Sequence, residues 1–130
     1  MGCMMTRLRR ARQLTLCVVL SAGAIAASAQ PVAREGRLVT PGGLALYTFA
    51  NDVPGSGRSV CLAPCSNIFP PYLVETGAAA TGELSIIERP DGTKQWAHKG
   101  RPLYRWFDDR EPADRGGDGM NRGLWQLAAP

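Results

Sequence analysis

The residues best suited to chemistry in this 130-residue chain belong to a six-residue motif, the hexad, that occurs twice. The two copies are Tyr47-Thr-Phe49-Ala-Asn-Asp52 and Tyr104-Arg-Trp106-Phe-Asp-Asp109, which start 57 residues apart. A duplicated unit that brought Asp52 and Asp109 together would supply a general acid and a general base. The alternative is that each carboxylate accepts backbone N–H bonds in its own loop and fixes a turn, and we favour it because Asp does this routinely.

A second candidate is the pair Cys61 and Cys65 in Cys-Leu-Ala-Pro-Cys. We favour a structural disulfide, because two cysteines this close usually pair in an oxidising compartment. The alternative is a redox or copper-handling site that uses the reduced pair with His98 and Met120. Three residues separate the cysteines, whereas thioredoxin-like redox sites have two, and a chain with one His is poorly suited to zinc. We therefore predict no metal site and no cofactor.

The aromatic side chains are candidates for ligand binding. Trp96, Trp125 and the aromatics of the two hexads offer broad faces and polar handles on which a sugar or an aromatic ligand stacks. A small β-domain with few other large apolar residues also needs these rings for its core, and we favour that interpretation. The stretch Asp114–Trp125 has the oxygen ligands of a calcium loop but lacks one at the third position and has Trp where the loop requires Glu.

No catalytic motif stands out. The chain has no Gly-x-Ser-x-Gly and no phosphate-binding loop, and its one His leaves a single choice for a Ser-His-Asp arrangement. We predict no catalytic residue and a role that is not enzymatic.

Residues 1–29 have the pattern of a signal peptide that is expected to form a helix. Four arginines precede the apolar stretch Leu14–Ala27, and Ala27-Ser28-Ala29 fits the cleavage pattern. The apolar stretch is shorter than the roughly 18 residues that span a bilayer, so no stable membrane span is expected after cleavage. Cys17 lacks the small preceding residue of a lipid-attachment site. We expect a periplasmic or secreted protein that begins at Gln30.

The charge balance changes once this segment is removed. Arg7, Arg9, Arg10 and Arg12 account for the whole net charge of +4, and all 11 acidic residues follow Ala29. The remaining domain, residues 30–130, is formally neutral, which argues against nucleic acid as a partner. Its length predicts one compact domain, expected to be a monomer, with an envelope ligand or protein of unknown identity as partner.

The pattern of the domain predicts an all-β fold. Strands are expected at 38–39, 44–50, 84–88, 93–97, 102–106 and 124–127, with 89–92 (Arg-Pro-Asp-Gly) as a hairpin turn. Residues 30–37 are expected to form a loose leader, and one helical turn is expected near 65–69, ended by two prolines. We predict two related β-meander halves, approximately 38–76 and 83–130, stapled by the disulfide.

These residues resemble a family of small secreted or lipid-anchored bacterial proteins named for the Tyr-x-(Phe/Trp/Tyr)-x-x-Asp motif and also called the secreted repeat of unknown function. The likeness covers about 44–130, through both hexads, the Cys pair followed by Phe69-Pro70-Pro71, the stretch 89–96, Gly116-Gly117-Asp118-Gly119 and Trp125. Phe69 stands where relatives have Trp, and the lipid-attachment Cys is missing. The resemblance implies a secreted, lipoprotein-like module without a known activity. A binding or interaction module is therefore the favoured function, with the redox or copper role as the alternative.

Overall fold

A computed structural model describes residues 17–18 and 29–130, so the predicted signal helix lies outside the described residues. The regular elements of the described chain are mainly short strands, together with two helices of four residues each. The elements are β1 (Val32–Arg34), β2 (Arg37–Val39), β3 (Tyr47–Phe49), α1 (Cys65–Ile68), β4 (Leu84–Glu88), β5 (Lys94–His98), β6 (Arg101–Pro102), α2 (Met120–Gly123) and β7 (Trp125–Leu127). No helix within the described ranges is long and apolar enough to cross a membrane. The all-β prediction is confirmed in that the regular elements are mostly strands in small antiparallel sheets, to which the structure adds two short helices.

The antiparallel sheet β4-β5-β6 confirms the meander predicted for the second half. Its hairpin pairs Leu84 with His98 and Glu88 with Lys94 around the Pro-Asp-Gly turn. The Asp91 carboxylate accepts the Thr93 amide at 2.9 Å and the Thr93 hydroxyl at 2.6 Å. These bonds hold the pKa of Asp91 below its usual value. The turn chemistry that predicts this hairpin is thus present in the structure.

Residues 30–37 are not the loose leader that the sequence predicted. β1 and β2 form an antiparallel hairpin in which Val32 lies opposite Val39 and Arg34 opposite Arg37. Its turn residues, Glu35 and Gly36, both have positive φ, 50° and 75°. Two positive φ values at the centre of a two-residue turn match the right-handed twist of the flanking strands. Turns of this type usually have Asn, Asp or Gly at the first position. Because Glu35 stands there, the sequence did not indicate the turn.

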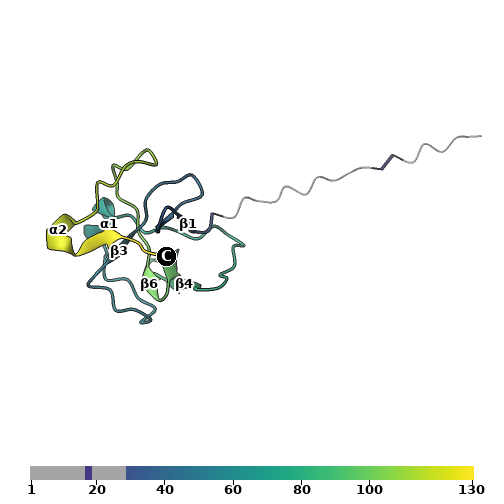
Figure 1. Cartoon of the computed structure of the whole chain (residues 1–130). Coiled ribbons are helices and arrows are strands. Elements are labelled where there is room, and N and C mark those ends of the chain that lie inside the picture. The colour runs from purple at the N-terminus through teal and green to yellow at the C-terminus, as the bar shows by residue number, and fades with distance from the viewer. Residues whose placement is uncertain (1–16, 19–28) are drawn as a thin grey trace, which may run out of the picture.

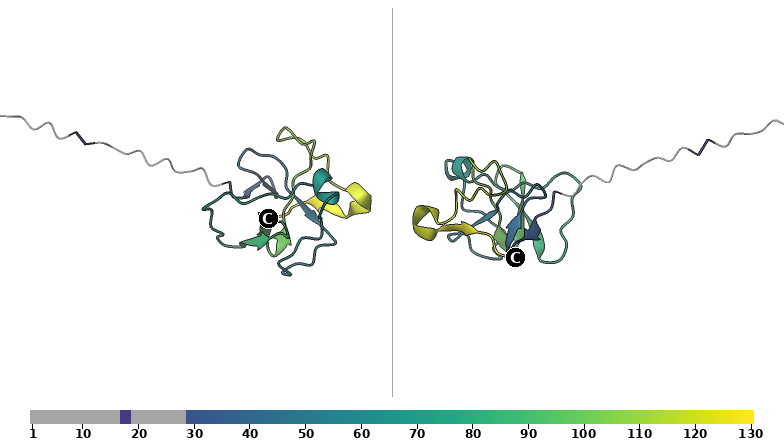
Figure 2. Two further views of the ribbon diagram at one scale, coloured as in Figure 1. Left: turned by 180° about the vertical axis from the view of Figure 1, so that it is seen from behind. Right: turned by 45° about the horizontal axis from the view of Figure 1, so that its top comes forward.

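The first half does not form a meander by itself. β3 pairs with β7, from the other end of the chain, and places Tyr47 opposite Leu127 and Phe49 opposite Trp125. The two strands run side by side beneath α1 in Figure 1. Figure 2 shows α2 at one end of the molecule and the β4–β6 sheet away from it. The prediction of two separate meanders is therefore wrong for residues 38–76, because their central strand finds its partner in the second half.

Each hexad separates two clusters of core residues. Leu46 and Leu103 pack with Leu38, Trp96 and Ala128 on one side. Tyr47 and Tyr104 face the opposite side, where the cluster consists of Ala45, Tyr47, Phe49, Cys61, Phe69, Tyr104 and Trp125. Successive residues of an extended chain point to opposite faces, so the Leu that precedes each hexad and the Tyr that begins it contribute to different clusters.

Candidate functional site

The two hexads meet along their backbones. The Tyr47 amide donates to the Tyr104 carbonyl at 2.8 Å, and the Tyr104 amide donates to the Tyr47 carbonyl at 3.0 Å. This reciprocal exchange is the hydrogen-bonded residue pair of an antiparallel ladder. It places the first residue of one copy directly opposite the first residue of the other, and the two copies run in opposite directions from there.

The side chains of the hexads cross over to the opposite copy. The Tyr104 hydroxyl donates to Oδ2 of Asp52 at 2.6 Å. The Tyr47 hydroxyl donates in the same way to Oδ2 of Asp109. All four side chains are buried, with relative exposures between 0% and 5%. The tyrosine of each hexad thus binds the aspartate of the other, and we refer to these contacts as the crossed Tyr–Asp pairs.

The second oxygen of each carboxylate holds its own loop. Oδ1 of Asp52 accepts the Val60 amide at 2.7 Å, and Oδ1 of Asp109 accepts the Gly116 amide at 2.9 Å. The backbone amide of each aspartate also closes a turn onto the carbonyl of the hexad aromatic, Phe49 or Trp106. These are the backbone bonds that we favoured over acid and base roles. The sequence did not predict the tyrosine partners.

Burial governs the ionisation of these groups. It raises the pKa of the Asp52 carboxyl, an effect offset in part by the bonds from Tyr104 and Val60 and by the positive charge of Arg89. Burial also raises the pKa of both Tyr47 and Tyr104 above the usual value of a phenol, and the bond to the aspartate adds to the effect. A phenol that stays protonated is a donor to the carboxylate and is not available as a general base.

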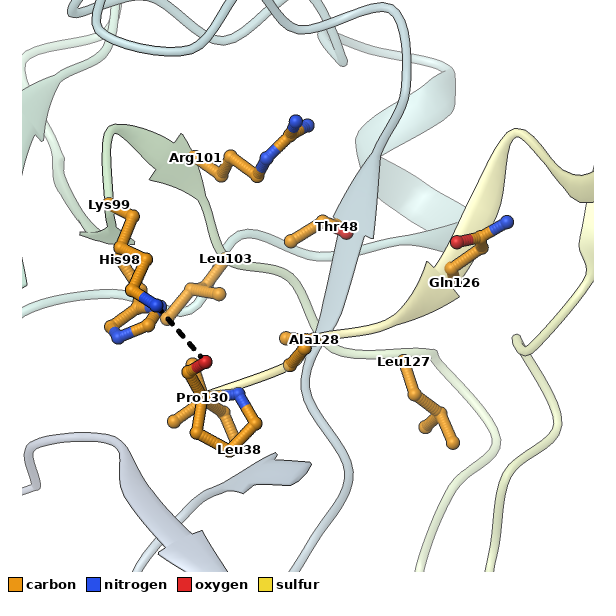
Figure 3. Close-up of a pocket in the computed structure, with 11 residues that line it drawn as sticks. Leu38, Thr48, His98, Lys99, Arg101, Leu103, Gln126, Leu127, Ala128 and Pro130 are labelled. Carbon is orange, nitrogen blue, oxygen red and sulfur yellow. Dashed lines mark hydrogen bonds between the residues drawn. The ribbon is translucent and has the colours of Figure 1, made fainter. Parts of the chain in front are cut away.

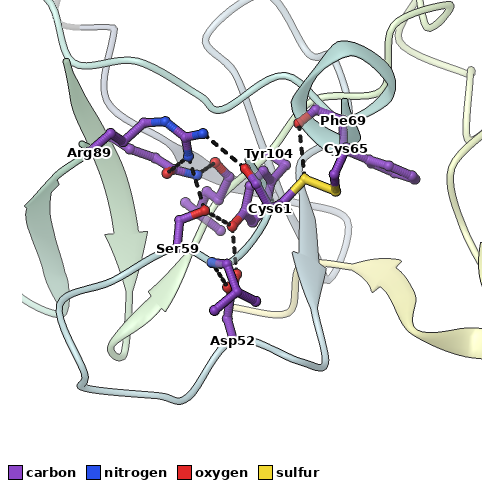
Figure 4. The surroundings of a disulfide bond; sticks show 10 residues. Asp52, Ser59, Cys61, Cys65, Phe69, Arg89 and Tyr104 are labelled. Atoms are coloured by element: carbon purple, nitrogen blue, oxygen red, sulfur yellow. Dashed lines mark hydrogen bonds between the residues drawn. A yellow bond between two sulfur atoms is a disulfide. The ribbon is translucent and has the colours of Figure 1, made fainter. Parts of the chain in front are cut away.

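A polar network joins the Tyr104–Asp52 pair to the surface next to the disulfide (Figure 4). The hydroxyl groups of Ser59 and Tyr104 lie 2.6 Å apart, and Nη1 of Arg89 donates to the Ser59 hydroxyl at 3.0 Å. Nη1 also donates to Oε1 of Gln95 at 2.8 Å, and Nη2 donates to the Cys61 carbonyl at 2.9 Å. The Ser59 hydroxyl is bonded on both sides, so it is poorly placed to act as a nucleophile.

Arg89, Gln95 and Ser59 were not among the predicted site residues. Arg89 belongs to the Arg-Pro-Asp-Gly stretch, which indicated only a turn. Its side chain turns inward and is 7% exposed, and Gln95 is fully buried. The signal in the sequence was Gln95 itself, a polar residue within strand β5 and next to Trp96, because a buried polar side chain needs hydrogen-bond partners.

The predicted disulfide Cys61–Cys65 is formed. Cys61 is fully buried in the core cluster of the tyrosines, whereas Cys65 is half-buried at the start of α1. The loop that the bond closes carries the exposed Leu62, and the carbonyl of Cys61 is a partner of Arg89. The bridge therefore ties α1 to the network that holds the two halves together.

The candidate stacking residues lie inside the molecule. Trp96 is fully buried and Trp125 is 2% exposed, and they belong to different core clusters. The Trp125 ring stacks on Phe49 with ring centres 4.3 Å apart and on Phe69 with ring centres 3.6 Å apart. Phe69 thus occupies the place beside Trp125 where a larger ring is expected in relatives. In this geometry the rings build the core, which is the alternative that we favoured.

The residues considered for metal binding are engaged elsewhere. Nε2 of His98 lies 3.5 Å from Glu83, and Met120 lies in α2 with 38% of its surface exposed. The Asp114 carboxylate accepts the amides of Arg110 and Glu111, which lower its pKa, and Asp118 accepts the Leu127 amide. Over residues 17–18 and 29–130, no group of three or more His, Cys, Asp or Glu side chains is placed to hold a metal ion.

A surface cavity of about 350 Å³ is lined by residues of β3, β5, β6 and β7 and of the C-terminal segment (Figure 3). Thr48 of β3 and Gln126 of β7 are cross-strand partners on its wall. Lys99 lines it from the turn that joins β5 to β6, and Arg101 lines it from the start of β6. The Lys99 ammonium donates to the Pro130 carbonyl at 3.3 Å. The cavity therefore offers hydroxyl, amide and cationic groups from segments that are far apart in the sequence.

Comparison with known proteins identifies one family model that matches part of the chain. No curated protein and no solved structure matches the chain significantly. Residues 85–129, which include the second hexad, match the model of a family that is named for lipoproteins and described as a secreted repeat of unknown function. This match confirms, over that stretch of the chain, the resemblance to the secreted-repeat family.

Proposed function

We propose that this protein is an exported, non-enzymatic binding module of the cell envelope, built from two related halves, 38–76 and 83–130. The observation that carries the proposal is the pair of crossed Tyr–Asp contacts. The phenols and carboxylates were the groups in the sequence best suited to chemistry. In the structure they form hydrogen bonds with one another in the interior. Buried, fully bonded groups hold a scaffold rigid, and the same scaffold leaves a polar cavity between its halves.

The cavity suits a ligand rich in hydrogen-bond acceptors. Its donors come from Thr48, Gln126, Lys99 and Arg101, which project from strands or from a tight turn. Groups on strands that are paired across the two halves are pre-organised, and little conformational entropy is lost when a ligand binds. Saccharides of the envelope offer hydroxyl and amide groups of this kind, so we propose them as the first ligand class.

The test is a screen of amino-sugar oligosaccharides by NMR chemical-shift perturbation and thermal shift on the exported, oxidised protein. A ligand is expected to move the amide signals of Thr48, Arg101 and Gln126. Arg101→Ala is expected to weaken binding about tenfold, whereas Arg110→Ala, which removes an exposed arginine outside the cavity, leaves it unchanged. Shifts confined to other surfaces, or equal losses in the two variants, would contradict the assignment of the cavity.

The second candidate is a redox role for Cys61 and Cys65. It is favoured by one observation, the half-buried position of Cys65 at the start of α1. Thiol–disulfide exchange needs access to a sulfur, and Cys65 has the better access of the two. Reduction under mild conditions with retention of the fold would support this role over the binding module.

A further inference from the structure

We propose that a second cavity, between the β1–β2 hairpin and the loop Pro112–Arg115, binds a phosphate group through Arg37. The cavity measures about 580 Å³ and is lined by Arg34, Glu35, Arg37 and Arg115 together with Val39, Gly43, Pro112 and Ala113. It is separate from the cavity of the proposed function, so this inference stands independently of it.

Arg37 carries the argument because its charge is buried without a counter-ion. The residue is 8% exposed, and within residues 17–18 and 29–130 its guanidinium makes one hydrogen bond, from Nη2 to the Pro112 carbonyl at 2.7 Å. Nε and Nη1 are buried and have no hydrogen-bond partner. In the part of the chain that the structure describes, no carboxylate forms an ion pair with it. A guanidinium has five N–H donors, and burying an unpaired charge is costly, so a site of this kind favours an anion.

The surroundings add positive charge where a stable hairpin would avoid it. Arg34 lies directly opposite Arg37 in the register of β1 and β2. Like charges in a directly opposed cross-strand pair repel each other. Arg115 approaches the same cavity from a loop far away in the sequence. Three arginines thus line one cavity. An anion bound among them relieves the repulsion between their charges.

Phosphate is the oxyanion that matches this arrangement best. Three guanidinium groups against the single carboxylate of Glu35 leave an excess of two positive charges, the charge that a phosphate monoester neutralises. The planar fork of arginine binds phosphate oxygens in pairs. The cavity volume exceeds that of phosphate alone, so the group can belong to a larger soluble ester or to a lipid headgroup.

The Glu35 carboxylate is the group within the protein that could compete with an external phosphate for Arg37. It sits in the exposed turn of the hairpin and lines the same cavity, although it forms no ion pair there. If its carboxylate serves as the counter-ion in solution, then Glu35→Gln will destabilise the protein and leave phosphate affinity unchanged. If an external phosphate is the counter-ion, then Glu35→Gln removes a competing negative charge and strengthens phosphate binding.

The experiment titrates the exported, oxidised protein with inorganic phosphate and follows the arginine Nε–H signals by NMR, against sodium chloride at equal ionic strength. The dissociation constant is expected in the range of about 1 mM, with the largest shifts at Arg37. Arg37→Gln is expected to weaken binding at least about tenfold, and Arg58→Gln, an exposed arginine in another loop, by less than about twofold. Arg115→Gln keeps the test decisive if Arg37→Gln does not fold, because Arg115 is exposed and its loss is expected to weaken binding severalfold.

Two further arms identify the source of the phosphate. Glycerol 3-phosphate tests a soluble ester, and vesicles that contain phosphatidic acid, whose headgroup is a phosphate monoester, compared with vesicles of phosphatidylcholine alone, test a lipid headgroup. Binding of either that is lost in Arg37→Gln or Arg115→Gln supports the site. The proposal is overturned if phosphate shifts no arginine signal beyond the chloride control, or if Arg58→Gln weakens binding as much as the cavity variants.

Discussion

The hydroxyl groups of Tyr47 and Tyr104 donate hydrogen bonds to carboxylates that are distant in sequence and adjacent in space. The loss of a hydroxyl leaves a buried carboxylate oxygen without its donor, which costs about 1–3 kcal/mol and more when the oxygen is charged. The crossed Tyr–Asp pairs therefore make the two hexads interdependent, since neither copy can satisfy its own aspartate.

This arrangement predicts which residues are energetically coupled. Tyr104→Phe and Asp52→Ala are expected to be coupled by about 1–3 kcal/mol in a double-mutant cycle measured by urea unfolding. The pair within one hexad, Tyr47 and Asp52, makes no hydrogen bond and is expected to be additive within about 0.5 kcal/mol. Stronger coupling within a hexad than between hexads would show that the crossed arrangement does not exist in solution.

The tyrosines also predict the behaviour of the protein in alkali. Burial raises the pKa of Tyr47, Tyr72 and Tyr104, the three tyrosines of the chain, above the usual value of about 10. Above that pH the unfolded state loses its phenolic protons before the folded state does, so the folded state holds more protons and the free energy of unfolding falls as the pH rises. Below about pH 9 these groups leave stability unchanged.

The measurement is tyrosinate absorbance against pH, recorded with circular dichroism on the same samples. Ionisation of the phenols is expected to coincide with loss of the fold. Two phenols that ionise near pH 10 while the circular dichroism stays native would contradict the burial of the crossed Tyr–Asp pairs.

At the scale of elements, the loop after the second hexad depends on a glycine beneath an aromatic ring. The Trp106 ring lies so close to Gly116 that an added Cβ would sit 2.0 Å from a ring atom. The Gly116 amide donates to Asp109 at the same place, so the loop cannot move away without breaking that bond. The Gly-Gly pair at 116–117 is therefore required by packing, because the following glycine would meet Phe69 in the same way.

Gly116→Ala is expected to destabilise the protein by about 1–3 kcal/mol through overpacking. Gly42→Ala is the matched control, because its added Cβ meets no atom closer than 3.8 Å, and its effect is expected to stay within about 0.5 kcal/mol. Thermal unfolding of both variants checks the prediction. Equal effects would mean that the Trp106 ring has room to move aside.

At the scale of the whole molecule, the disulfide and the pairing of β3 with β7 close a domain that has only short strands. The disulfide closes a loop of about five residues, which contributes about 2 kcal/mol to the free energy of unfolding by the chain-entropy relation. A small domain has a narrow margin of stability, so a contribution of this size matters.

Replacement of Cys61 and Cys65 by Ser is expected to lower the free energy of unfolding by about 2 kcal/mol or more, because Cys61 is buried among apolar rings and Ser would place a hydroxyl there. Cys65→Ser alone, with Cys61 left as a buried thiol, separates the loss of the bridge from the burial of the hydroxyl. Free-thiol titration with and without mild reductant, followed by thermal melts, provides the measurement. A pair that reduces readily while the melting temperature is unchanged would favour the redox role.

The sequence by itself determined what local patterns encode. Alternation and turn chemistry predicted the β4–β5 hairpin, and the spacing of Cys61 and Cys65 predicted their bridge. Such features depend on residues a few positions apart, so their physics is visible along the chain. The same reasoning missed the β1–β2 hairpin, because Glu35 is a rare residue at a positive φ.

Only the tertiary structure decided the long-range partners. Nothing in the hexad says that β3 pairs with β7, that each tyrosine reaches the aspartate of the other copy, or that Arg37 and Arg89 turn inward. The choice among distant partners is made by the packing of the whole core and by the need to satisfy every buried polar group at once. This requirement is why the hexads, which suggested acid and base chemistry in the sequence, hold the halves together in the fold.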